Sequence, residues 1–214
     1  MPIVLPRLYV ILDATLLPNS PIQCAQELAG AGVRLLQYRD KSAPARDLLK
    51  TSRELVSALQ PHGASLIVND RPDVAVLAGA SGVHVGQEDL EPEQARAVVG
   101  ENMWVGASSH NLEQFRQAAA TSADYIAVGP IFPTTSKANP DPVVGLDLLR
   151  QVRSLTEKPI VAIGGITLDR AASVIAAGAD CVAVIRDVLC AAKPGLQARR
   201  YLETLAAANH AAAV

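Results

Sequence analysis

Two patterns of apolar and polar positions alternate along the chain from one end to the other. Short apolar runs, typical of buried strands, are followed by segments in which apolar residues recur every three or four positions, as on one face of a helix. The helical pattern is clearest over 45–59, where leucines and Val56 form one stripe. We predict strands over 8–12, 33–38, 65–68, 82–85, 104–106, 125–128, 159–163 and 181–185. We predict helices over 22–31, 45–59, 72–78, 92–99, 112–120, 146–155, 170–177 and 196–208.

This alternation of strands and helices predicts the topology of the sheet. Strands that alternate with helices pair in parallel, and eight such units in a single run close naturally into a barrel. Glycine follows several predicted helices, as at Gly79, Gly100 and Gly178, where it accepts the left-handed backbone that ends a helix. No linker or shift in composition divides the chain, so we predict an α/β protein with a single (β/α)8 TIM barrel over residues 1–214. An open, doubly wound sheet is the alternative, and it requires a crevice where the strand order reverses.

Composition and charge narrow the possible partners. Hydrophobic residues make up 50% of the chain and aromatic residues only 3%, so the core must consist mainly of Ala, Val, Leu and Ile. The formal charge of −2 lacks the basic excess of a nucleic-acid binder, and no apolar run approaches the roughly 18 residues of a membrane span. Three cysteines without metal-ligand spacing, and an N-terminus without a secretory pattern, predict a reduced cytoplasmic protein. We therefore expect small-molecule partners, and neither nucleic acid nor membrane.

Polar residues follow every predicted strand, at the end of the barrel where this fold places its active sites. Asp70 and Asp89 would follow neighbouring strands, and two nearby carboxylates form a hard oxygen site that suits Mg²⁺ together with a substrate phosphate. The alternative is that Asp70 only caps the helix that begins near Pro72. His84 and His110 lie at the same end, and we interpret both as hydrogen-bonded structural residues rather than proton shuttles.

Three cationic residues and a glycine pair are candidates for binding the phosphate groups of a substrate. Arg39, Lys41 and Lys137 could face the mouth that holds the carboxylates and would suit a diphosphate, whereas a solvated turn is the simpler interpretation of 39–41 alone. Gly164 and Gly165 follow a predicted strand and could offer backbone N–H groups to a phosphate. A tight turn that requires glycine is an equally good interpretation of this pair.

Five segments at the ends of predicted strands, in this order, resemble those of the thiamine-phosphate synthase (thiamine-phosphate pyrophosphorylase) family. They are Gln37-Tyr38-Arg39-Asp40-Lys41, Asn69-Asp70-Arg71, Gly82-Val83-His84-Val85-Gly86-Gln87-Glu88-Asp89, Gly129-Pro130-Ile131-Phe132-Pro133-Thr134-Thr135-Ser136-Lys137 and Ile163-Gly164-Gly165-Ile166. Each segment is a weak signal alone, but together they form a specific one. The resemblance covers nearly the whole chain.

The resemblance implies a Mg²⁺-dependent transferase that condenses 4-amino-2-methyl-5-hydroxymethylpyrimidine diphosphate with 4-methyl-5-(2-phosphoethyl)thiazole, giving thiamine phosphate and pyrophosphate. By position, the residues implied to hold the pyrimidine diphosphate are Gln37, Arg39, Lys41, Asn69, Ser108 and Lys137. Those implied to hold the thiazole phosphate are Thr134, Ser136, Gly165 and the backbone around Ile185 and Arg186. The implied metal ligands are Asp70 and Asp89, and the implied catalytic residues are Arg39, Ser108 and Lys137.

The route implied by the family is dissociative, because the diphosphate leaves before the thiazole nitrogen attacks the resulting pyrimidine-methyl cation. Arg186 departs from the family, whose members often carry a small residue such as serine there, and leaves open whether its side chain or its backbone meets the phosphate. A thiazole tautomerase and a non-catalytic phosphate-binding regulator are the rival functions, and the retained carboxylates and cations favour the synthase. The long polar connection over 132–144 is predicted to act as a lid over the site.

Overall fold

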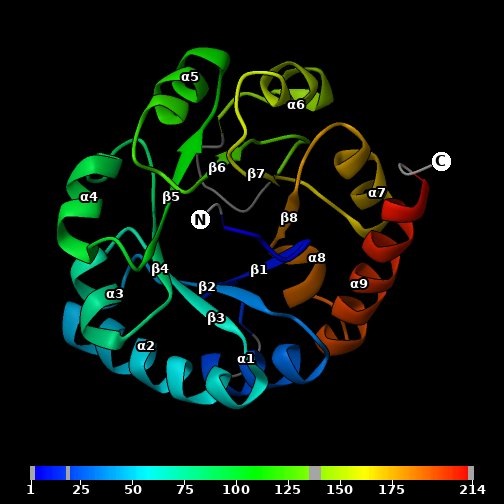
Figure 1. Ribbon diagram of the computed structural model, residues 1–214. Coiled ribbons are helices and arrows are strands. Elements are labelled where there is room, and N and C mark those ends of the chain that lie inside the picture. Colours follow the sequence, from blue (N-terminus) through cyan, green and yellow to red (C-terminus); the bar gives the residue numbers. More distant parts are fainter. Residues whose placement is uncertain (1–2, 18–19, 135–140, 212–214) are drawn as a thin grey trace.

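A computed structural model describes residues 3–17, 20–134 and 141–211 of the chain. Its strands pair in parallel in chain order from β1 to β8, and β8 returns to β1, so the sheet closes into a barrel. Figure 1 looks into this barrel and shows the helices as a ring around it, with α9 packed beside α7. The predicted TIM barrel is therefore confirmed, and the open doubly wound sheet is excluded.

The element bounds agree with the sequence prediction at most positions. The strands are β1 Leu8–Asp13, β2 Leu35–Arg39, β3 Ser65–Asn69, β4 Gly82–Val85, β5 Trp104–Ser109, β6 Tyr125–Val128, β7 Ile160–Ile163 and β8 Cys181–Val184. The helices are α1 Pro21–Gly30, α2 Ala45–Leu59, α3 Pro72–Ala78, α4 Pro92–Val99, α5 Leu112–Ala120, α6 Gly145–Arg153, α7 Leu168–Ala176, α8 Arg186–Leu189 and α9 Pro194–Ala211, with a short 3-10 turn at Gln60–His62. The main differences are the unpredicted α8 and the longer β5, whose serines continue the ladder with β6.

The apolar side chains form two layers of core, one on each face of the closed sheet. Residues that alternate along a strand point to opposite faces, so Leu8, Val10 and Leu12 pack outward against the helices. Tyr9 and Ile11, from the same strand, pack inside the barrel. The interior is thus filled by side chains, as expected for a barrel of this size, and its upper layer forms the floor of the site.

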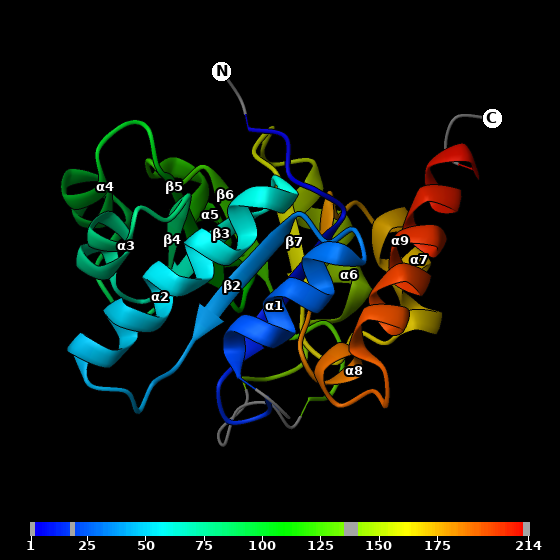
Figure 2. The ribbon, with the colours of Figure 1, turned by 90° about the horizontal axis from the view of Figure 1, so that it is seen from below.

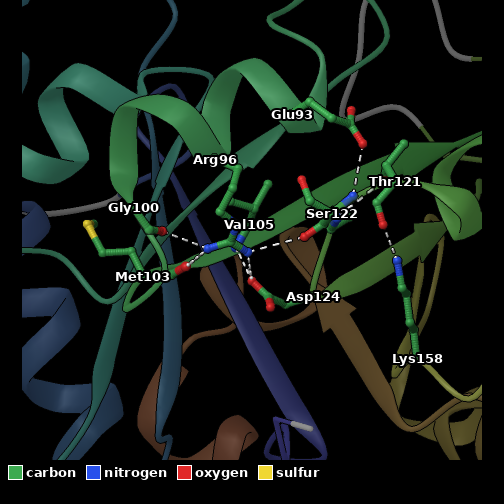
Figure 3. Close-up of polar contacts among 10 residues, drawn as sticks. Glu93, Arg96, Gly100, Met103, Val105, Thr121, Ser122, Asp124 and Lys158 are labelled. Carbon is green, nitrogen blue, oxygen red and sulfur yellow. Dashed lines mark hydrogen bonds and ion pairs between the residues drawn. The ribbon is translucent and has the colours of Figure 1, made fainter. Parts of the chain in front are cut away.

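Partly buried ion pairs stabilise the amino end of the barrel. Arg96 of α4 donates to the Asp124 carboxylate at 2.5 Å and to backbone carbonyls of the adjoining loops, as Figure 3 shows. Asp124 also accepts from the backbone N–H of Val105, at the start of β5. Arg153 and Asp180 repeat this arrangement two strand–helix units further on, at 2.7 Å. In this fold, contacts at the amino ends of the strands stabilise the barrel, and the active site lies at the opposite, carboxyl ends.

None of the helices in the described ranges is long and apolar enough to cross a membrane.

Candidate active site

A cavity of about 730 Å³ opens at the carboxyl ends of the strands. In Figure 2 this end, marked by the tip of β2 and by α8, lies away from both chain termini. The predicted site residues that line the cavity are Gln37, Arg39, Asn69, Ser108, Thr134, Gly165, Ile185 and Arg186. Residues from distant parts of the sequence therefore converge on one hollow.

Two of the predicted site residues, Ser136 and Lys137, lie outside the described residues. Residues 135–140 of the segment predicted to act as a lid, 132–144, also lie outside the described residues. Their roles remain predictions.

Arg39 is held at the rim by a carboxylate to which the sequence assigned no role. Its Nη1 lies 2.5 Å from Oδ2 of Asp13, whose side chain is almost fully buried. The other oxygen of Asp13 accepts from the backbone N–H and the hydroxyl of Thr15, at 3.0 and 2.6 Å. Because both oxygens are engaged, Asp13 fixes the guanidinium at the junction of β1 and β2, beside the cavity.

Asp70, Asp89 and Lys41 form a charged cluster beside the cavity. The ammonium of Lys41 lies 3.2 Å from Oδ2 of Asp70, and Oδ2 of Asp89 accepts from the backbone N–H of Gly86 at 2.8 Å. Burial raises the pKa of the Asp89 carboxyl, and its contact with the Asp70 carboxylate raises it further. The two carboxylates thus lie together, as the sequence predicted.

The alternative role of Asp70 as a helix cap is wrong. The N-cap of α3 is Arg71, and no side-chain hydrogen bond caps this helix. Asp70 instead has a φ of 62°, a left-handed conformation that non-glycine residues rarely adopt. Its backbone N–H donates to the carbonyl of His84 at 2.8 Å, which ties this unusual conformation to β4. Such conformations persist where the surrounding structure fixes them, and they cluster at functional sites.

The donor set of this cluster fits Mg²⁺. Among the described residues no group of three or more His, Cys, Asp or Glu side chains could enclose a metal ion. Mg²⁺ does not need such an enclosure, since it keeps several waters and commonly binds through one or two carboxylates and a substrate phosphate. A cation between Asp70 and Asp89 would also relieve the repulsion that raises the pKa of Asp89.

The glycine pair after β7 makes a tight turn that only glycine fits. Gly164 and Gly165 have φ values of 98° and 61°. A Cβ added to Gly165 would collide with the carbonyl oxygen of Pro133 and lie 2.8 Å from that of Phe132. The turn therefore serves as a seat for the loop that follows β6, and its backbone borders the cavity. This favours the turn interpretation of the pair.

Several residues that line the cavity were missed by sequence reasoning. Arg170 donates to the carbonyl of Gly165 at 3.0 Å and lies 4.6 Å above the ring of Phe132. It sits within the first turn of α7, where nothing in the local pattern separates it from a solvated arginine. Tyr9 lines the floor of the cavity, although its strand reads only as a buried apolar run. His84 and His110 are hydrogen-bonded, as predicted, and both also line the cavity.

Comparisons with known proteins agree with this geometry. The family model described as thiamine monophosphate synthase matches residues 8–188. A thiamine-phosphate synthase of Koribacter versatilis is 54% identical over 94% of this chain and 96% of its own length. One of Methanospirillum hungatei is 40% identical over 92% of this chain and 97% of its own length. The solved structure of a thiamine phosphate pyrophosphorylase from Pyrococcus furiosus superposes with a TM-score of 0.86 and 33% identity, covering 94% of this chain and 96% of the other.

A barrel of this topology, a cavity at its carboxyl rim and full-length similarity to proteins of one activity lead to a single assignment. The chain is an enzyme of thiamine biosynthesis and belongs to the thiamine monophosphate synthase family.

Proposed function

We propose that this enzyme joins 4-amino-2-methyl-5-hydroxymethylpyrimidine diphosphate to 4-methyl-5-(2-phosphoethyl)thiazole, with release of pyrophosphate. The observation that carries the proposal is that one cavity of about 730 Å³ is bordered on different sides by two sets of the predicted substrate-binding residues. Ligand pockets for small molecules typically span ~300–1,000 Å³, so this cavity has room for two small substrates side by side. A one-substrate isomerase would have no use for both sets.

The first set suits the pyrimidine diphosphate. Gln37, Arg39 and Asn69 line the side of the cavity formed by β2 and β3, and Lys41 follows at the rim. Arginine and lysine stabilise negative charge as it grows on a departing diphosphate, provided that they are held in place beforehand. Asp13 holds the Arg39 guanidinium in place through the 2.5 Å contact. We assign Lys137 to the same task by family position.

Mg²⁺ would be held by Asp70 and Asp89 and would neutralise charge on the diphosphate when bound. Other residues of the protein already hold these two carboxylates in place. Lys41 lies against Asp70 at 3.2 Å, so its ammonium is already directed toward the place where a diphosphate would meet the carboxylates. Gly86 holds the Asp89 carboxylate through its backbone N–H.

The second set, on the opposite side of the cavity, suits the thiazole phosphate. Thr134, Gly165 and the backbone at the start of α8 border this side. The Arg186 side chain is exposed, which supports a contact through its backbone rather than through its guanidinium. Ser136 is assigned here by family position.

The floor between the two sets supports a dissociative route. Ile11, Ala127 and Val161 line it, and such aliphatic side chains exclude water from a reactive pyrimidine-methyl cation. A route of this kind needs no protein nucleophile. The chain's contribution is to hold the leaving group, exclude water and position the thiazole nitrogen.

The test is an assay of pyrophosphate release with both substrates and Mg²⁺, repeated with EDTA. We expect pyrophosphate and thiamine phosphate in equal amounts, and loss of both with EDTA. A thiazole tautomerase or a phosphate-binding regulator would release no pyrophosphate, and that result would refute the proposal.

A further inference from the structure

Five polar side chains form a continuous hydrogen-bonded chain inside the barrel. In order, they are Gln37 of β2, Tyr9 of β1, Tyr125 of β6, His84 of β4 and Ser108 of β5. Its two ends, Gln37 and Ser108, are residues that we assign to the pyrimidine diphosphate. The three between them have no role in the proposed function.

The contacts along this chain are short enough to be hydrogen bonds throughout. Nε2 of Gln37 lies 2.7 Å from the hydroxyl of Tyr9, which lies 3.2 Å from the hydroxyl of Tyr125. That hydroxyl lies 3.2 Å from Nδ1 of His84. Nε2 of His84 lies 2.9 Å from Oγ of Ser108. The chain thus crosses the barrel from one side of the cavity to the other.

Burial, ring stacking and a glycine in β5 hold the side chains of this hydrogen-bonded chain in place. Gln37, Tyr9 and Tyr125 are at most 2% exposed. The rings of His84 and Tyr125 stack with centroids 5.6 Å apart. Gly106 of β5 gives them room, because a Cβ there would collide with the Tyr125 ring and lie 2.5 Å from Nδ1 of His84. A glycine inside a strand often marks such a close approach.

The direction of every hydrogen bond follows from the first one. The Nε2 amide group of Gln37 can only donate, so the Tyr9 hydroxyl accepts and its single hydrogen is directed to Tyr125. Burial raises the pKa of both tyrosines, so each keeps its hydrogen. Tyr125 accepts from Tyr9 and therefore donates to Nδ1 of His84.

At the other end of this hydrogen-bonded chain, Ser108 offers the cavity a donor instead of an acceptor. An Nδ1 that accepts has no hydrogen, so the ring hydrogen of His84 is on Nε2 and is donated to Ser108. The hydrogen of the Ser108 hydroxyl is then directed away from His84. Gln37 keeps its carbonyl oxygen as an acceptor. One end of the chain thus offers the cavity an acceptor and the other a donor.

We propose that Tyr9, Tyr125 and His84 are positioning residues that fix this polarity and thereby select an aminopyrimidine diphosphate. Gln37 accepts from the amino group of the ring, and Ser108 donates to an oxygen of the diphosphate. This inference rests on the proposed function. It adds that discrimination between a donor and an acceptor on the pyrimidine ring is set by residues that do not contact it.

The first test reads the direction of the chain without any substrate. The protein contains four histidines, and ¹⁵N-histidine labelling with a His84→Gln comparison assigns the ring signals of His84. We expect the neutral tautomer with hydrogen on Nε2 and a bare Nδ1. A hydrogen on Nδ1 would mean that the chain runs the other way and would overturn the proposal.

The second test reads specificity at the Gln37 end. Tyr9→Phe removes the acceptor that holds the Gln37 amide, which can then turn and present either of its faces. We expect the wild type to prefer the 4-amino substrate over its 4-oxo analogue, and Tyr9→Phe to lose roughly 3- to 10-fold of that preference, the scale of one hydrogen bond. The KM for the thiazole phosphate should not change.

The control is Tyr38→Phe. Tyr38 is equally buried, but it belongs to the outer core, and its hydroxyl contacts Asp40 at 3.4 Å instead of the interior chain. Tyr38→Phe removes the same hydroxyl oxygen as Tyr9→Phe does, and it should keep the wild-type preference for the 4-amino substrate. Tyr125→Phe should weaken binding of the pyrimidine diphosphate by a similar factor through Ser108, again without affecting the thiazole phosphate.

The outcomes separate this inference from the proposed function. If the wild type forms thiamine phosphate but Tyr9→Phe and Tyr38→Phe discriminate equally, the positioning role is refuted and the function stands. If the wild type forms none, the proposed function itself has failed.

Discussion

The turn after β7 leads to a prediction with a matched internal control. Gly165→Ala places a methyl group in a left-handed backbone, with φ at 61°, against the carbonyl oxygens of Pro133 and Phe132. Gly63→Ala places the same methyl group in the same backbone conformation, also with φ at 61°, but apart from its chain neighbours no atom of the described residues lies within 4 Å. Gly63 ends the 3-10 turn that precedes β3, so it lies at the opposite end of the barrel from the cavity.

The difference between the two variants isolates the packing of the loop onto the turn. A residue with a Cβ in a left-handed backbone costs ~1–2 kcal/mol, which the reduced entropy of the unfolded chain offsets by ~0.4–1 kcal/mol. Gly63→Ala should therefore lose about 1 kcal/mol of unfolding free energy. Overpacking adds ~1–3 kcal/mol, so Gly165→Ala should lose about 2–4 kcal/mol.

Urea unfolding of both variants measures these losses, and steady-state kinetics measures their effect on the site. Because the loop carries Thr134, its displacement by Gly165→Ala should raise the KM for the thiazole phosphate, whereas Gly63→Ala should leave it unchanged. Equal stability of the two variants, with equal KM values, would refute the idea that the turn seats the loop.

Three further outcomes follow. Asp70→Asn and Asp89→Asn should each cause a large loss of turnover that high Mg²⁺ partly restores, with little change in stability; near-normal activity at limiting Mg²⁺ would refute the metal assignment. Arg186→Ser should change the KM for the thiazole phosphate only slightly, since its side chain is exposed, and a tenfold or larger rise would show that the guanidinium binds the phosphate. Asp124→Asn should lower the unfolding free energy by ~1.5–3 kcal/mol through its bond to Arg96, without altering the KM for either substrate.

The sequence predicts the fold well because each strand and helix repeats one simple pattern. The predicted bounds of α2 and β4 equal the observed ones, since both lie between clear turn signals and have unbroken periodicity. It fails for α8, because one turn of helix is too short to show a period. It also ends β5 at Gly106, where a glycine reads as a stop although the ladder continues.

The candidate site is predictable only where a residue type itself indicates chemistry. The proximity of Asp70 and Asp89 can be predicted from the sequence, because both carboxylates follow neighbouring strands at the same end of the barrel. The task of Asp13 depends on the partner that the next strand brings to it, and a single strand does not show this. The interior chain is hidden for the same reason, since Tyr9 and Tyr125 are separated by 116 positions and meet only when the barrel closes.

The most direct test of the account is a crystal structure with thiamine phosphate, pyrophosphate and Mg²⁺ bound together. We predict pyrophosphate beside Arg39 and Asn69, with Mg²⁺ between it and the carboxylates of Asp70 and Asp89. The phosphate of thiamine phosphate should lie across the cavity, at Gly165 and the start of α8. Ligands bound outside this cavity, or a metal held without either carboxylate, would contradict the account.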